Sequence, residues 1–145
     1  MSADLLFTIC SIAVIPGWAL LVLLPRWRWT LGLISPGVVP FVLGLVYLTL
    51  FLTEGFEGPE GSGFGSLEAV MLLFSVPYAV VIGWIHYLAF DLFVGCWELQ
   101  DSQKKGISHW VMIPCLFMTF MLGPIGLVLY LIIRTVKTRE LTIYA

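Results

Sequence analysis

Four long stretches of apolar residues follow one another along the chain, separated by shorter polar segments. Each stretch has the length of about 20 residues that an α-helix needs to cross the hydrocarbon core of a bilayer. We therefore predict four spans, at about residues 5–24, 31–52, 77–97 and 109–133. The pattern predicts an all-α polytopic membrane protein, a four-helix transmembrane bundle that occupies residues 1–145 as a single domain.

Prolines inside the predicted spans indicate kinked helices, because proline removes a backbone hydrogen bond. Pro36 and Pro40 interrupt the first half of the second span. Gly123 and Pro124 lie within the fourth span, where they predict a kink in one continuous crossing.

The longest polar segment, residues 53–65, contains five glycines, one proline and three glutamates. This composition predicts an irregular, acidic loop. Ser66 follows the loop and is suited to cap a helix, so we predict a short interfacial helix over residues 67–74. Pro77 is suited to the first turn of the third span.

The composition supports a membrane protein and excludes a soluble monomer. Of all residues, 60% are apolar and 11% are charged, whereas ordinary globular proteins have about 25% charged residues. So few charges cannot cover the large surface of a small soluble fold. The seven Lys and Arg residues are scattered and form no basic stripe. We therefore expect membrane lipid as a partner and no nucleic acid. The sequence does not predict an oligomeric state.

The distribution of basic residues predicts the orientation of the chain in the membrane. With four spans, the first and third loops share one side and carry four Lys or Arg, while the other side carries three. The positive-inside rule then places both termini on the non-cytoplasmic side, by one charge. Arg134, at the end of the fourth span, is typical of residues that anchor a helix at the lipid headgroups.

Two residues of the third span, His86 and Asp91, are the strongest candidates for chemistry. A charged group near the bilayer centre costs several kcal/mol, and such groups are usually functional. The two residues are five positions apart, about 140° around a helix, and do not share a face. The third helix should therefore be the most enclosed of the bundle, or one of the two residues should face a polar cavity. Alternatively, each residue bonds a neighbouring helix and does no chemistry. Asp91 shares a helix face with Trp84, Tyr87 and Glu98 rather than with His86.

Five residues have side chains that could bind zinc or iron: His86, Asp91, Glu98, Asp101 and His109. However, no H-x-x-x-H or E-x-x-H pair lies on one helix face, so we expect no metal and no other cofactor. Glu98 and Asp101 are expected to bind water at the membrane edge.

Residues 86–126 carry a more specific pattern, and read HYLAFDLFVGCWELQDSQKKGISHWVMIPCLFMTFMLGPIG. The combination of H-Y-L-A-F-D-L-F-V-G-x-W, D-x-x-x-x-G-I and P-C-L-x-x-T-F-x-x-G-P-x-G resembles the abscisic-acid-deficient-4-like family of small membrane proteins. Its plant members are associated with the conversion of violaxanthin to neoxanthin in plastid membranes. The chain is short and lacks a plastid transit extension, so the resemblance implies a prokaryotic relative in the inner membrane.

The resemblance implies a membrane protein that acts on a carotenoid or a related isoprenoid. The chemistry expected is that of an acid–base isomerase that converts an epoxide into an allene. Asp91 would be the acid and His86 the base, provided that helix bending brings both to one cavity. The alternative is a non-catalytic carotenoid or lipid binder, or a scaffold subunit of a membrane complex. The residues expected to bind substrate are Trp84, Tyr87 and Trp97, and the expected polar partners are Glu98, Asp101 and His109.

Overall fold

The computed structural model describes residues 1–30, 32, 37–55 and 58–140, and all secondary structure in this part of the chain is helical. The all-α prediction is therefore confirmed. The helices are α1 (Ala3–Leu23), α2 (Val38–Thr53), α3 (Leu67–Leu73), α4 (Pro77–Lys104), α5 (His109–Leu122) and α6 (Pro124–Thr138).

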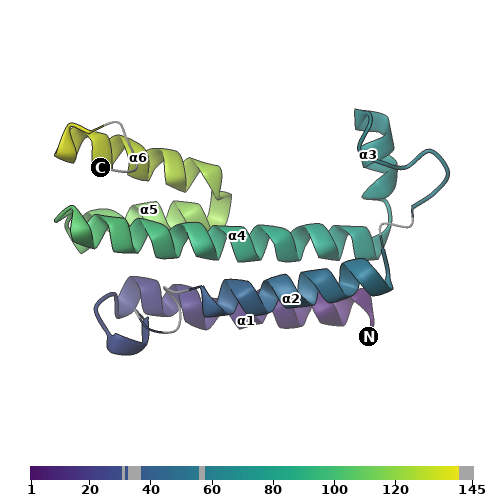
Figure 1. Cartoon of the computed structure of the whole chain (residues 1–145), viewed down its shortest axis with the longest axis horizontal. Coiled ribbons are helices and arrows are strands. Elements are labelled where there is room, and N and C mark those ends of the chain that lie inside the picture. The colour runs from purple at the N-terminus through teal and green to yellow at the C-terminus, as the bar shows by residue number, and fades with distance from the viewer. Residues whose placement is uncertain (31, 33–36, 56–57, 141–145) are drawn as a thin grey trace.

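The long helix α4 is the centre of the molecule. It contacts α1 and α2 on one side and α5 and α6 on the other (Figure 1). Among the described helices it has the most buried residues, and Ile82, Ile85, Leu92 and Leu99 are 0% exposed. This agrees with the prediction that the third apolar stretch would be the most enclosed.

Local sequence signals explain where several helices begin. The Ser66 hydroxyl accepts a hydrogen bond from the Ala69 amide at 3.1 Å and caps α3, as the sequence predicted. Pro77 occupies the first turn of α4, where its missing N–H has no helical partner to lose. Pro40 lies in the first turn of α2 and does not interrupt it. Pro36 and the predicted start of the second span lie outside the described residues.

The prediction that residues 109–133 form one crossing is wrong. At Gly123 the chain reverses, and α6 runs back along α5 (Figure 1). Gly123 has φ 47° and ψ −98°, a positive φ that glycine adopts without a steric penalty, and Pro124 then begins the new helix. Gly126 lets the two helices approach, since a Cβ atom there would lie 2.1 Å from the Thr119 nitrogen. The expected kink is thus a helical hairpin.

Two described helices, α1 and α4, are long and apolar enough to cross a membrane. The apolar helices α2 and α5 have 16 and 14 residues, and a helix of 14 residues is only about 21 Å long. The four-span bundle that the sequence predicted is therefore not confirmed by the described residues. The two ends of the bundle differ: the N-terminus lies at one and the end of α6 at the other (Figure 1).

Candidate functional site

One face of α4 carries a row of polar side chains that point towards the α5–α6 hairpin. We call these residues the polar stripe: Tyr87, Asp91, Glu98 and Asp101. Their spacings of 4, 7 and 3 residues bring them to nearly the same side of a helix with 3.6 residues per turn. The hairpin covers the stripe: Glu98 and Asp101 are buried, and Tyr87 and Asp91 are partly buried.

Asp91 lies beneath the turn of the hairpin. A Cβ atom on Gly123 would be 2.8 Å from Asp91 Oδ1, so any side chain at this position would displace the carboxyl group. The Tyr87 hydroxyl donates to the Phe120 carbonyl at 3.4 Å and also interacts with the Asp91 carboxyl. Asp91 Oδ2 is buried and has no hydrogen-bond partner among the described residues. A buried carboxyl oxygen is thus available for a further hydrogen bond.

Glu98 lies two helical turns further along the stripe and is 0% exposed. The Thr119 hydroxyl of α5 lies 3.0 Å from both of its carboxyl oxygens and donates to this group. The expectation that Glu98 binds water at the membrane edge is therefore wrong. Its contact with Thr119 joins α4 to α5 inside the protein.

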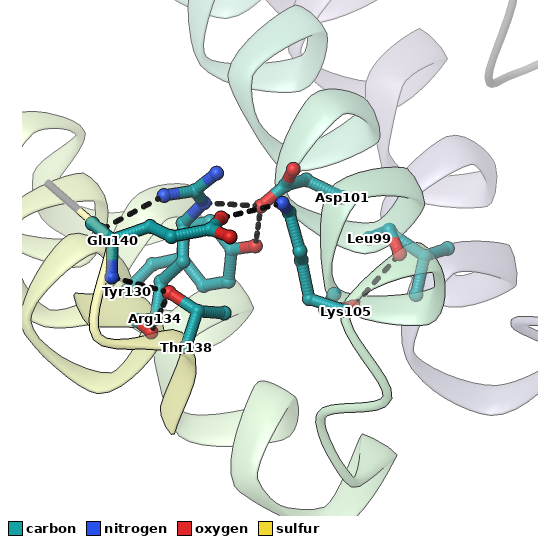
Figure 2. A network of polar contacts seen from close by, with 8 residues as sticks. Leu99, Asp101, Lys105, Tyr130, Arg134, Thr138 and Glu140 are labelled. Atoms are coloured by element: carbon teal, nitrogen blue, oxygen red, sulfur yellow. Dashed lines mark hydrogen bonds and ion pairs between the residues drawn. The ribbon is translucent and has the colours of Figure 1, made fainter. Parts of the chain in front are cut away.

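Asp101 forms the last part of the stripe and binds α6 (Figure 2). Arg134 Nε donates to Asp101 Oδ2 at 2.7 Å, and the Tyr130 hydroxyl donates to the same oxygen. Trp97 packs edge-on against the Tyr130 ring, with the centroids 5.5 Å apart. Arg134 is only 1% exposed, so it is not the headgroup anchor that the sequence indicated. It neutralises a buried carboxylate.

A second ion pair closes the same end of the molecule. Lys105 Nζ donates to Glu140 Oε2 at 2.8 Å (Figure 2), and this hydrogen bond, with the charge of Lys105, lowers the pKa of Glu140. Arg134 Nη1 also donates to the Glu140 carbonyl at 3.4 Å. These contacts hold the segment after α6 against the end of α4.

His86 lies outside the polar stripe. It is exposed, stacks on Phe90 with 4.5 Å between centroids, and lies 5.9 Å from the Tyr47 ring of α2. The structure therefore does not bring His86 and Asp91 to one cavity, and the condition for their pairing is not met.

The two remaining predicted residues, Trp84 and His109, each join α1 to another helix. Trp84 stacks on Tyr87 at 5.3 Å, and its Nε1 donates to the Ser11 hydroxyl at 2.9 Å. His109 begins α5, far from Asp91, and its Nε2 donates to the Val22 carbonyl at 2.8 Å. No group of three or more His, Cys, Asp or Glu side chains that could hold a metal ion occurs in the described part of the chain.

The family model described as ABA DEFICIENT 4-like matches residues 5–130. The chain belongs to this family. The match contains the whole polar stripe, both hairpin residues Gly123 and Pro124, and Tyr130. Membership confirms the resemblance seen in the sequence and indicates a carotenoid-related function. No curated protein and no solved structure is significantly similar to the chain.

Sequence reasoning missed the hairpin residues that complete the site of this ABA DEFICIENT 4-like protein. Thr119, Tyr130 and Arg134 were not recognised as partners of the acidic residues. The one available signal was the spacing of Tyr130 and Arg134, which are four residues apart and hence share a helix face. Nothing local in the sequence shows that this face meets Asp101.

Proposed function

We propose that the protein is a multi-pass membrane isomerase that acts on a carotenoid, with Asp91 as the group that transfers the proton. The family supports the substrate class. The observation that carries the reaction type is the Asp91 carboxyl, whose buried Oδ2 has no hydrogen-bond partner in the described part of the chain. A carboxyl group with an unpaired oxygen in an apolar layer costs free energy, and leucine would fill its place without that cost.

The reaction that suits this group is the conversion of an epoxide on a carotenoid end ring into an allenic alcohol. The Asp91 O–H proton passes to the epoxide oxygen as one carbon–oxygen bond breaks. The proton on the adjacent vinyl carbon passes to the other carboxyl oxygen, and the electron pair of that C–H bond forms the new double bond. A neutral carboxyl group has both a donor and an acceptor oxygen, so one residue supplies both proton transfers without net redox change.

This proposal changes the roles expected from the sequence. His86 is not part of the reaction, because it lies on another face of α4. Tyr87 contacts the Asp91 carboxyl and would orient it. Trp84 stacks on Tyr87 and would offer the substrate ring a flat apolar surface. Trp97 is further away and packs against Tyr130.

The proposed membrane topology has three crossings, α1, α2 and α4, and a hairpin, α5–α6, that enters and leaves on the same side. Tyr78 donates to the Met1 carbonyl at 2.7 Å, and Gln103 donates to the Pro25 carbonyl at 2.8 Å, so α1 and α4 run in parallel. The hairpin returns the chain to the Pro25 end. All seven basic residues then belong to that end: Arg26, Arg28, Lys104, Lys105, Arg134, Lys137 and Arg139.

In this topology one side of the membrane has all seven Lys and Arg residues and the other has none, whereas four crossings would divide them four to three. The opposite end carries the acidic residues Asp4, Glu54, Glu60 and Glu68. By the positive-inside rule the basic end is cytoplasmic. The C-terminus would then be cytoplasmic and the N-terminus would face the other side.

A non-catalytic carotenoid binder is the second candidate, and one observation favours it. A wholly apolar groove lies between α1 and α5, and binding alone would require nothing more. Expression in a violaxanthin-producing bacterial strain, followed by pigment chromatography and mass spectrometry, separates the two functions. A new allenic pigment of unchanged mass supports the isomerase. An unchanged pigment profile, with violaxanthin bound to the purified protein, supports the binder.

A further inference from the structure

The groove between α1 and α5 has a volume of about 580 Å³ and only apolar lining residues. Its size falls within the range of small-molecule sites, about 300–1,000 Å³. It extends along α1 from Ile15 to Leu23, which corresponds to about 12 Å of helix. Its lining includes Trp18, Ala19 and Val22 of α1 and Phe117 and Phe120 of α5.

One end of the groove adjoins the Asp91 site. Phe120 lines the groove, and its carbonyl accepts the hydrogen bond from Tyr87. The Phe120 ring contacts Trp18, with 5.3 Å between centroids. Trp18 in turn rests on α4, since a Cβ atom on Gly95 would lie 2.7 Å from the indole ring. The groove therefore ends beside Tyr87, which contacts the Asp91 carboxyl group.

The other end of the groove adjoins a polar pocket of about 450 Å³, which Arg26, Gln103 and His109 help to line. His109 joins the two spaces, because its Nε2 donates to the carbonyl of Val22, a residue of the groove. The lining thus changes from wholly apolar to partly polar towards the basic end of the molecule.

We propose that this groove binds the part of the carotenoid polyene next to the end ring that reacts at Asp91. The inference rests on the proposed function. An uncharged isoprenoid matches a lining without polar residues. A rigid polyene also loses less conformational freedom on binding than a flexible acyl chain, and the aromatic rings of Trp18, Phe117 and Phe120 offer flat surfaces to it.

The test is a pair of substitutions on α1. Ala19 is exposed and lines the groove, so Ala19→Trp fills the groove without disturbing the core. Ala13 is equally exposed on the same helix and lies outside the groove lining, so Ala13→Trp is the matched control. Each full-length variant is reconstituted into phosphatidylcholine–phosphatidylglycerol vesicles that contain β-carotene or violaxanthin, and the carotenoid retained per protein is measured after purification.

We expect Ala19→Trp to lower retention of both carotenoids by about tenfold, while Ala13→Trp retains as much as the wild type. Asp91→Asn should retain both pigments. If Ala19→Trp retains as much carotenoid as the wild type, or if both alanine variants lose carotenoid equally, the groove is not the binding site. Retention of phospholipid alone by the wild type also overturns it. If only Ala19→Trp lowers carotenoid retention but the wild type never converts violaxanthin, the proposed isomerase activity is wrong and the groove is still the carotenoid-binding site.

Discussion

Gly123, in the turn between α5 and α6, lies directly against the carboxyl group of Asp91. A Cβ atom at Gly123 would approach Asp91 Oδ1 to 2.8 Å and Oδ2 to 3.1 Å. The residue that reverses the chain is therefore also the residue that covers the candidate proton donor. Fold and site depend on the same glycine.

Gly123→Ala should destabilise the hairpin for two reasons. Its φ of 47° is strained for a residue with a side chain, at a cost of about 1–3 kcal/mol, and the new methyl group collides with Asp91. We expect a lower midpoint of thermal unfolding in detergent and reduced turnover. Gly44→Ala is the control, because no atom lies within 4 Å of a Cβ at this position of α2. Equal midpoints for Gly123→Ala and the wild type would show that the turn does not require glycine.

The helix starts of the fold were predictable because their signals are local. Ser66 caps the helix that follows it, and Pro77 occupies the first turn of its helix, as their residue types indicate. Gly123 and Pro124 are equally visible in the sequence but are compatible with either a kink or a reversal. The packing of Gly126 against Thr119 decides between them, and this contact depends on tertiary structure.

The candidate site was only half visible in the sequence. The positions of Tyr87 and Asp91 on one face follow from helical spacing. The partner of Asp101 lies 33 residues away, at Arg134, and no periodicity links the two. An acidic residue beyond an apolar stretch is typical of the membrane edge, so the sequence predicts that Glu98 and Asp101 bind water. In the structure both bind residues of the hairpin instead.

The buried pair of Asp101 and Arg134 should show strong coupling. Arg134→Met leaves a buried carboxylate without its cation, and breaking such a pair costs about 3–5 kcal/mol. The double variant Asp101→Leu/Arg134→Met removes both charges and should be more stable than the sum of the single losses implies. Thermal unfolding of the four proteins in detergent gives the coupling energy. Strictly additive losses would mean that the pair does not hold α6 to α4.

The segment after α6 should detach at low pH. Lys105 lowers the pKa of Glu140 from its ordinary value of 4.5, so the folded tail favours ionised Glu140. Its contribution is present above about pH 4.5 and is lost as the pH falls through the lowered pKa. The Glu140 amide donates to the Thr138 hydroxyl at 3.2 Å and reports the change by hydrogen exchange, corrected for the intrinsic pH dependence. Glu140→Gln should abolish this pH response; an unchanged response would assign it to another group.

The three-crossing topology makes a prediction opposite to that of four crossings. Reporter fusions after Ala145 should be active on the cytoplasmic side, because all the basic residues lie at that end of the bundle. Fusions within residues 53–65 should report the other side. A C-terminus on the same side as residues 53–65 would contradict the re-entrant hairpin, and a non-cytoplasmic C-terminus opposite that loop would contradict the orientation alone.

His86→Gln provides a control for the chemistry. His86 is exposed and stacks on Phe90, so the substitution should leave carotenoid conversion within about twofold of the wild type. Pigment chromatography at matched membrane abundance measures this. If His86→Gln still binds the carotenoid but no longer converts it, His86 takes part in the reaction and α4 must change conformation to bring it to Asp91.

The most direct test of the account is Asp91→Asn. Asparagine keeps the shape of the side chain but has no proton to give or take as an acid. The variant and the wild type are compared in a violaxanthin-producing strain at matched membrane abundance, with the allenic product measured by chromatography. We predict that Asp91→Asn still binds violaxanthin but forms less than about one hundredth of the product. An Asp91→Asn protein that converts violaxanthin at the wild-type rate would contradict the central claim.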